Sequence, residues 1–107
     1  MYTLNSYDHR IVDENYKEIV VKLQDLKFHY ISIPIYYKTI TTLATLFAIR
    51  KMIIEGSNNT TNYEDTIRHI ANNIVSDSIT QIRDYDNPIQ KRKMFMDWIE
   101  EELKKTT

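Results

Sequence analysis

The stretch PIYYKTITTLATLFAIRKMIIE, residues 34–55, decides the fold of this chain. Pro34 suits the first turn of a helix, where its missing N–H would have no intrahelical partner, and Ser32 or Ile33 can serve as the N-cap. Gly56 follows directly and suits the left-handed conformation that ends many helices. The stretch is therefore predicted to form one long helix.

Apolar residues occupy most of the circumference of this predicted helix. They are Ile40, Leu43, Ala44, Leu46, Phe47, Ala48, Ile49, Met52, Ile53 and Ile54. A surface helix has an apolar stripe only about 100° wide, so other helices must cover this one. Lys38 and Arg50 interrupt it, and the uncharged part between them is well short of the roughly 20 apolar residues that cross a bilayer. The pattern favours a buried core helix over a membrane span.

Three further segments show the three- and four-residue apolar spacing of amphipathic helices. The first follows Asp8 or Asp13, and its stripe consists of Val12, Tyr16, Ile19, Val20, Leu23, Leu26 and Tyr30. The second starts at the capping-box sequence of residues 61–64, and its stripe consists of Tyr63, Ile67, Ile70, Ala71, Ile74, Val75, Ser78, Ile79 and Ile82. The last starts at Asn87 and Pro88, runs to about Lys105, and has an inner stripe of Ile89, Arg92 (through its stem), Phe95, Met96, Ile99 and Leu103.

Together these segments predict an all-α fold in which residues 1–107 form a single helical domain. The expected architecture is a compact four-helix bundle with the helix of about residues 34–55 buried at its centre. Residues 1–7 show no clear period and are predicted to be irregular or a short extended arm. Residues 28–35, FHYISIPI, have partly alternating β-branched and aromatic residues, but no second strand is evident, so an extended connector is favoured over a strand.

The composition excludes several classes of function. Charged residues make up 27% of the chain and the apolar class 42%, which is ordinary for a soluble globular protein. The formal net charge of −1 gives no general attraction to nucleic acid or to an anionic membrane. The absence of cysteine excludes disulfides, zinc–thiolate sites and thiol nucleophiles. No basic-then-apolar leader is evident, so a cytoplasmic location is expected, in the host cytoplasm if the source is a virus.

The sequence carries no pattern typical of catalysis. His9, His29 and His69 lie in different segments, and no His-Glu-x-x-His motif occurs. Asp65 and His69 are four residues apart and could supply two metal ligands, but the sequence indicates no others. The single glycine excludes a glycine-rich phosphate loop. We therefore expect a protein that is not an enzyme and that has no cofactor and no bound metal.

A protein interface is the favoured function. Tyrosine and tryptophan are common at interface hot spots, although they are also ordinary at the rim of a small core. The residues expected at the interface are Tyr30, Tyr36, Tyr37 and Trp98. The surplus apolar surface of the central helix points the same way, to a homodimer or to docking on a larger protein. Abundant Ile, Asn, Lys and Tyr, whose codons are A/T-rich, suggest an accessory or inhibitory protein of a virus, a phage or an A/T-rich bacterium.

A nucleic-acid-binding regulator is the alternative hypothesis. Lys91, Arg92 and Lys93 lie in the first turn of the last helix, where cations oppose the helix dipole. Residues 66–83 loosely resemble a helix-turn-helix, which would add Arg68 and Arg83 to the contact surface. The segment has no glycine at the expected turn, however, and its apolar stripe continues unbroken. A protein partner is thus favoured over nucleic acid, and a membrane is not expected.

Overall fold

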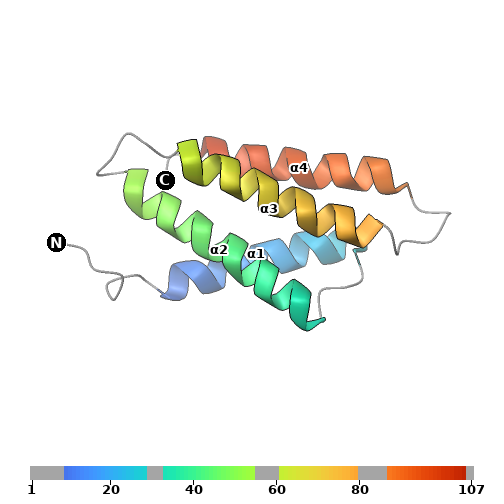
Figure 1. The fold of residues 1–107 in the computed structure, drawn as a ribbon, viewed down its shortest axis with the longest axis horizontal. Coiled ribbons are helices and arrows are strands. Elements are labelled where there is room, and N and C mark those ends of the chain that lie inside the picture. Colours follow the sequence, from blue (N-terminus) through green and yellow to red (C-terminus); the bar gives the residue numbers. More distant parts are fainter. Residues whose placement is uncertain (1–8, 29–32, 55–60, 80–86, 106–107) are drawn as a thin grey trace.

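A computed structural model describes residues 9–28, 33–54, 61–79 and 87–105, and within these ranges the chain forms four α-helices (Figure 1). They are α1 (His9–Asp25), α2 (Pro34–Ile54), α3 (Thr61–Ile79) and α4 (Pro88–Lys104). The predicted all-α fold is confirmed, and α2 ends within one residue of the predicted limit. The predictions for residues 1–7 and for the turn at Gly56 lie outside the described residues, as do residues 29–32 of the predicted connector.

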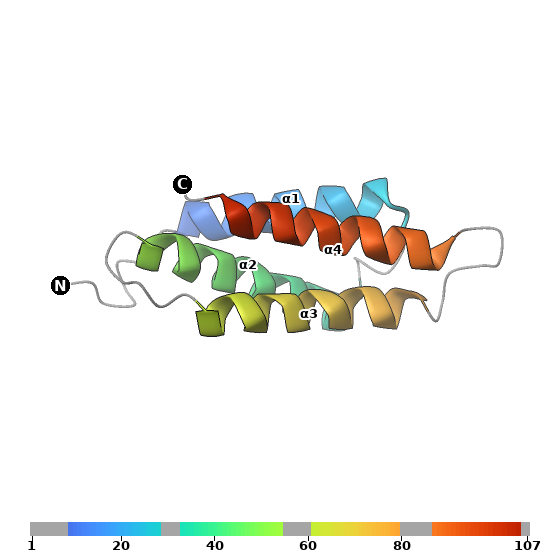
Figure 2. The same cartoon turned by 90° about the horizontal axis from the view of Figure 1, so that it is seen from above.

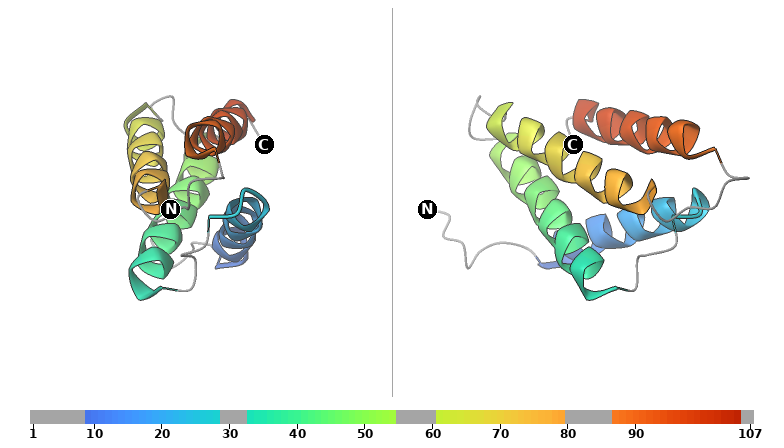
Figure 3. Two further views of the ribbon diagram at one scale, coloured as in Figure 1. Left: turned by 90° about the vertical axis from the view of Figure 1, so that its right-hand side faces the viewer. Right: turned by 45° about the vertical axis from the view of Figure 1, so that its right-hand side comes forward.

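The helices pack in chain order, α1 on α2, α2 on α3 and α3 on α4. The end view in Figure 3 shows α2 in the middle, with α3 to one side of it and α1 to the other. Figure 2 shows α4 running antiparallel to α1 along the same side of the molecule. Among the described residues, α1 and α4 make no comparably close backbone contact, so this side of the bundle is less tightly closed.

The central helix α2 begins and packs largely as expected. The Tyr37 amide donates to the Ile33 carbonyl at 3.1 Å, which makes Ile33 the N-cap and puts Pro34 in the first turn. The buried side chains of α2 are Tyr36, Ile40, Leu43, Ala44, Phe47, Ala48 and Arg50. Thr41 and Thr42 face solvent instead, and their hydroxyls donate to carbonyls one turn earlier at 2.7 and 2.9 Å. The apolar residues predicted for α2 are buried or half-buried wherever their burial is described, and these two threonines take the exposed side.

The end of α1 differs from the predicted stripe, which continued to Tyr30. The helix ends at Asp25 in a Schellman motif, with Lys27 at the left-handed position that glycine usually takes (φ 60°). The amides of Lys27 and Phe28 donate back to α1 carbonyls at 2.9 and 2.8 Å. This turn brings Phe28 into the core, where it is 2% exposed and meets the Phe95 ring edge-on with 6.5 Å between ring centroids.

A buried arginine ties α2 to both C-terminal helices. Arg50 is 3% exposed, and its Nε donates to Glu64 Oε1 at 3.0 Å near the start of α3. Its two terminal nitrogens donate to the carbonyls of Leu103 and Lys105 at the end of α4, the latter at 3.4 Å. These carbonyls have no partner within their own helix, so Arg50 acts as a C-cap supplied by another helix.

The inner face of α4 is shorter than predicted. Asn87 caps the helix as expected, its Oδ1 accepting from the Gln90 amide at 3.1 Å. Phe95, Ile99 and Leu103 are buried, and Met96 packs partly against them. Ile89 is 79% exposed, however, and Arg92 is also exposed, because this first turn lies at one end of the bundle (Figure 2). Within the described ranges, none of the helices combines the length and the apolar character needed to cross a bilayer.

Candidate functional site

An open groove runs between α1 and α4, with a volume of about 370 Å³. Its lining residues are Lys17, Glu18, Val21, Lys22 and Asp25 of α1 with Trp98 and Glu102 of α4. We call it the α1–α4 groove. Charged side chains on both facing surfaces explain why the two helices do not close into a dry seam, because burying an unpaired charge is costly.

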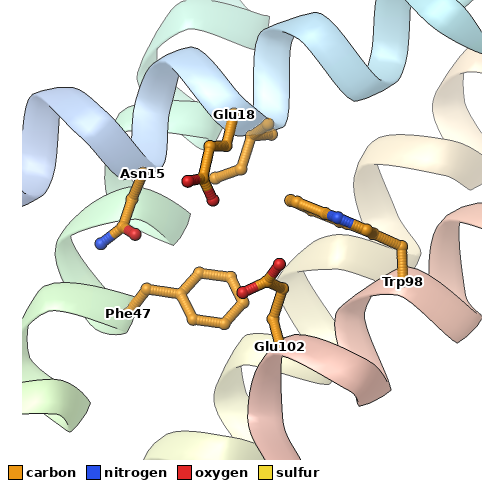
Figure 4. A pocket seen from close by; sticks show the side chains of 6 residues that line it. Asn15, Glu18, Phe47, Trp98 and Glu102 are labelled. Atoms are coloured by element: carbon orange, nitrogen blue, oxygen red, sulfur yellow. The ribbon is translucent and has the colours of Figure 1, made fainter. Parts of the chain in front are cut away.

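The indole of Trp98 forms one wall where the groove meets the core (Figure 4). Trp98 packs on Phe95 with 5.7 Å between ring centroids, so one part of the indole belongs to the core and another part faces the groove. The carboxylates of Glu18 and Glu102 point into the space between the helices, and the buried ring of Phe47 lines the same pocket. The groove thus combines a large aromatic surface with acidic groups.

Near the C-terminus of α4, the groove residue Glu102 forms an ion pair. Glu102 has a side chain only 13% exposed, and its Oε1 accepts from Lys105 Nζ at 3.0 Å. The hydrogen bond from Lys105 to Glu102 raises the pKa of Lys105, and the nearby carboxylates of Glu18 and Glu101 raise this pKa further. The Lys105 ammonium therefore stays protonated beside these carboxylates.

An exposed valine lies on the α1 side of the groove. Val21 is 61% exposed, whereas Val20 beside it packs against the core. Residues four apart share a helix face, so Lys17 and Asp25 lie on the same side of α1 as Val21. None of these three residues was among the predicted site residues. The available signal was the Val20–Val21 pair, since a helix can turn only one of two adjacent valines fully toward its core.

The predicted interface aromatics are not gathered at one site. Trp98 lines the α1–α4 groove. Tyr36 is buried in the core, where its hydroxyl lies 3.2 Å from the Ser78 hydroxyl, so it is not available to a partner in this structure. Tyr37 is 48% exposed at the start of α2 and is not among the residues that line the groove. Tyr30 lies outside the described residues.

Tyr37 forms a second aromatic feature with Tyr16 of α1. The two rings stack with 6.1 Å between centroids and 13° between planes. Burial raises the pKa of Tyr16, and the neighbouring Tyr37 raises it further. The Tyr16 phenol therefore stays neutral at physiological pH, and the stacked pair joins α1 to α2.

The cations of the nucleic-acid hypothesis are largely engaged within the protein. Arg68 binds Glu100 in a bidentate pair at 2.7 and 3.1 Å, and these hydrogen bonds lower the pKa of Glu100. Lys93 pairs with Asp97 at 2.7 Å. These contacts compensate two cations that would otherwise be available to phosphates.

The structure describes two of the other three cations of that hypothesis. Arg92 donates to Asn72 of α3, Lys91 is half-buried, and Arg83 lies outside the described residues. In the described part of residues 66–83, α3 continues without a turn to Ile79, as the unbroken apolar stripe indicated and against the helix-turn-helix alternative. Its apolar stripe packs against the core along this length, which leaves no separate recognition helix.

The described residues also hold no metal centre of their own. Among them, no three or more His, Asp or Glu residues are grouped so as to hold a metal ion. Asp65, one of the two potential ligands noted in the sequence, accepts from Arg68 at 3.0 Å.

The α1–α4 groove therefore remains the best-defined candidate site. Comparison with protein-family models, with curated proteins and with solved structures finds no match to this chain.

Proposed function

We propose that this protein is a small helical protein–protein interaction module that binds its partner through the α1–α4 groove. The observation that carries the proposal is that the exposed Val21 and the indole of Trp98 line the same open groove. Apolar and aromatic side chains of this kind form the centres of interfaces, where they are desolvated on binding.

The charged residues around this apolar centre suit the rim of an interface. Charges of both signs border Val21 and Trp98, including Lys17, Lys22 and Glu18. Exposed charges at a rim add little affinity, but they select partners and set the docking orientation. Such a module acts by occupying a surface and needs no catalytic chemistry of its own. The A/T-rich amino-acid usage makes an accessory or inhibitory protein of a virus, phage or A/T-rich bacterium the proposed setting.

The test compares two matched substitutions, Val21→Glu in the groove and Ile89→Glu outside it. Both place a carboxylate on an exposed aliphatic position of a helix, since Val21 is 61% and Ile89 79% exposed. Purified wild type and both variants are examined for self-association, and each is immobilised to capture proteins from a lysate of the source cells. We expect Val21→Glu to weaken binding and Ile89→Glu to leave it unchanged, with circular dichroism confirming that both variants fold.

Binding that survives Val21→Glu unchanged would overturn the assignment to the groove. A protein that associates neither with itself nor with any other protein would overturn the proposed function. The nucleic-acid alternative is tested on the same material, by ultraviolet absorbance ratios at low and high salt. Nucleic acid that co-purifies at low salt and is lost at high salt would favour that alternative.

A further inference from the structure

One face of α1 places an exposed valine midway between two opposite charges. Lys17 precedes Val21 by four residues and Asp25 follows it by four, so the three side chains form a single i±4 row. All three are exposed, and all three line the α1–α4 groove. Neither Lys17 nor Asp25 forms an ion pair with any other residue in the described ranges.

This arrangement of charges is complementary to itself. When two identical helices pack antiparallel with Val21 on the two-fold axis, Lys17 of each copy comes to the same height as Asp25 of the other. A parallel arrangement would instead put like charges together. Two i±4 rows interdigitate when helices cross at about −50°, the commonest helix-packing class in globular proteins. The row from Lys17 to Asp25 therefore has the geometry for two symmetric ion pairs that flank a central apolar contact.

We propose that the partner of the α1–α4 groove is a second copy of this chain, docked antiparallel through α1. Val21 packs on Val21 of the partner at the two-fold axis, and Lys17 pairs with Asp25 across the interface twice. Such an interface is isologous, the form found in most homodimers. Trp98 lies on the same groove and adds aromatic surface beside the valine contact. This inference rests on the proposed function, whose binding surface it uses.

The accessibility of α1 supports this arrangement. The end view in Figure 3 shows α1 at the edge of the bundle, with its outer side away from α2. The groove side of α1 is also the side on which the neighbouring α4 packs least closely. Because Lys17, Val21 and Asp25 are all exposed, a second α1 can contact this row without displacing a helix of the first copy.

The test is a charge exchange, followed by sedimentation equilibrium over a range of protein concentrations. Lys17→Asp and Asp25→Lys each turn both intermolecular pairs into like-charge contacts, and we expect each to weaken the dimer by at least about tenfold. The double variant Lys17→Asp/Asp25→Lys restores opposite charges with their positions exchanged, and it should dimerise nearly as well as the wild type. Lys38→Asp is the control for Lys17→Asp, because it makes the same change in net charge at an exposed position on α2.

Each outcome decides between the dimer and the wider proposal. A wild type that stays monomeric at all concentrations overturns the second-copy inference; the groove proposal still stands if Val21→Glu abolishes capture of a different protein. A dimer that is insensitive to the α1 charges overturns both the inference and the assignment of binding to the groove. A double variant that is no better than the single variants overturns the antiparallel pairing of Lys17 with Asp25. The pairing is established if both single variants dimerise more weakly than the wild type, the double variant dimerises nearly as well as the wild type, and Lys38→Asp leaves the dimer unchanged.

Discussion

Replacing Arg50 by methionine should destabilise the fold more than any substitution at a surface cation. The guanidinium donates to Glu64 Oε1 at 3.0 Å and to the carbonyls of Leu103 and Lys105. Hydrogen bonds that involve a charged group contribute about 1.5–3 kcal/mol each. Adding the contributions of all three hydrogen bonds overstates the loss of stability. The Glu64 side chain is 24% exposed, so water can replace part of the hydrogen bonding that Glu64 loses when Arg50 is removed. We therefore expect Arg50→Met to lower the free energy of unfolding by about 3 kcal/mol.

Urea denaturation followed by far-ultraviolet circular dichroism measures this loss, with an unchanged m-value showing that the same surface unfolds. Methionine retains most of the apolar stem of Arg50, which limits the cavity that the substitution leaves. Lys93→Met is the matched control, because the Lys93 and Asp97 side chains are 74% and 61% exposed. That exposed pair should contribute about 0.5 kcal/mol or less. Equal losses in Arg50→Met and Lys93→Met would refute the inter-helix capping role of Arg50.

Three further predictions concern local features of the fold. Lys27→Gly should raise the free energy of unfolding by about 0.5–1 kcal/mol, because glycine relieves a left-handed backbone at φ 60°; a loss in urea denaturation would contradict the Schellman assignment. Tyr36→Phe should cost about 1 kcal/mol in the same assay, because it removes the buried contact to the Ser78 hydroxyl at 3.2 Å, and an unchanged midpoint would show that this contact adds nothing. Arg68 lowers the pKa of Glu100 below its usual 4.5, so their pair stabilises the fold above about pH 4.5 and loses this contribution as the pH falls through the lowered pKa. Arg68→Gln should lower the free energy of unfolding by about 0.5 kcal/mol at neutral pH, because the pair is half-exposed, and this loss should shrink in acid. A loss that grows in acid would contradict the stabilisation of ionised Glu100 by Arg68.

The helices could be predicted from the sequence because their signals are local. Pro34 and the Asn87–Pro88 pair mark helix starts through the backbone groups of a single turn, and the structure begins α2 and α4 there. The apolar period likewise identifies the inward faces of the middle turns, where neighbouring helices are present on both sides. Ile19 and Ile74 are buried as their spacing predicts.

The periodic pattern was less informative where tertiary contacts decide the outcome. The stripe of α1 appeared to continue to Tyr30, but Phe28 enters the core only if the chain turns at Lys27. Ile89 fits the stripe of α4 and is nevertheless exposed, because its turn lies at the end of the bundle. Arg50 was taken as a charge that interrupts an apolar helix, and its buried role depends on where α3 and α4 place an acceptor and free carbonyls.

The candidate site was harder to predict than the fold because it depends on which helices fail to pack. The expected apolar surplus was on α2, but α1 and α3 cover that helix, and its exposed middle carries threonines. The uncovered apolar surface instead lies between α1 and α4. Charged side chains on both helices line the groove there, and Val21 and Trp98 are part of the same lining. Helical spacing could have marked Val21 as an apolar residue on a polar face, but not that Trp98 would stand opposite it. An interface made by two helices that are distant in sequence requires the three-dimensional arrangement, and charge order within α1 then indicates the orientation in which a second copy fits.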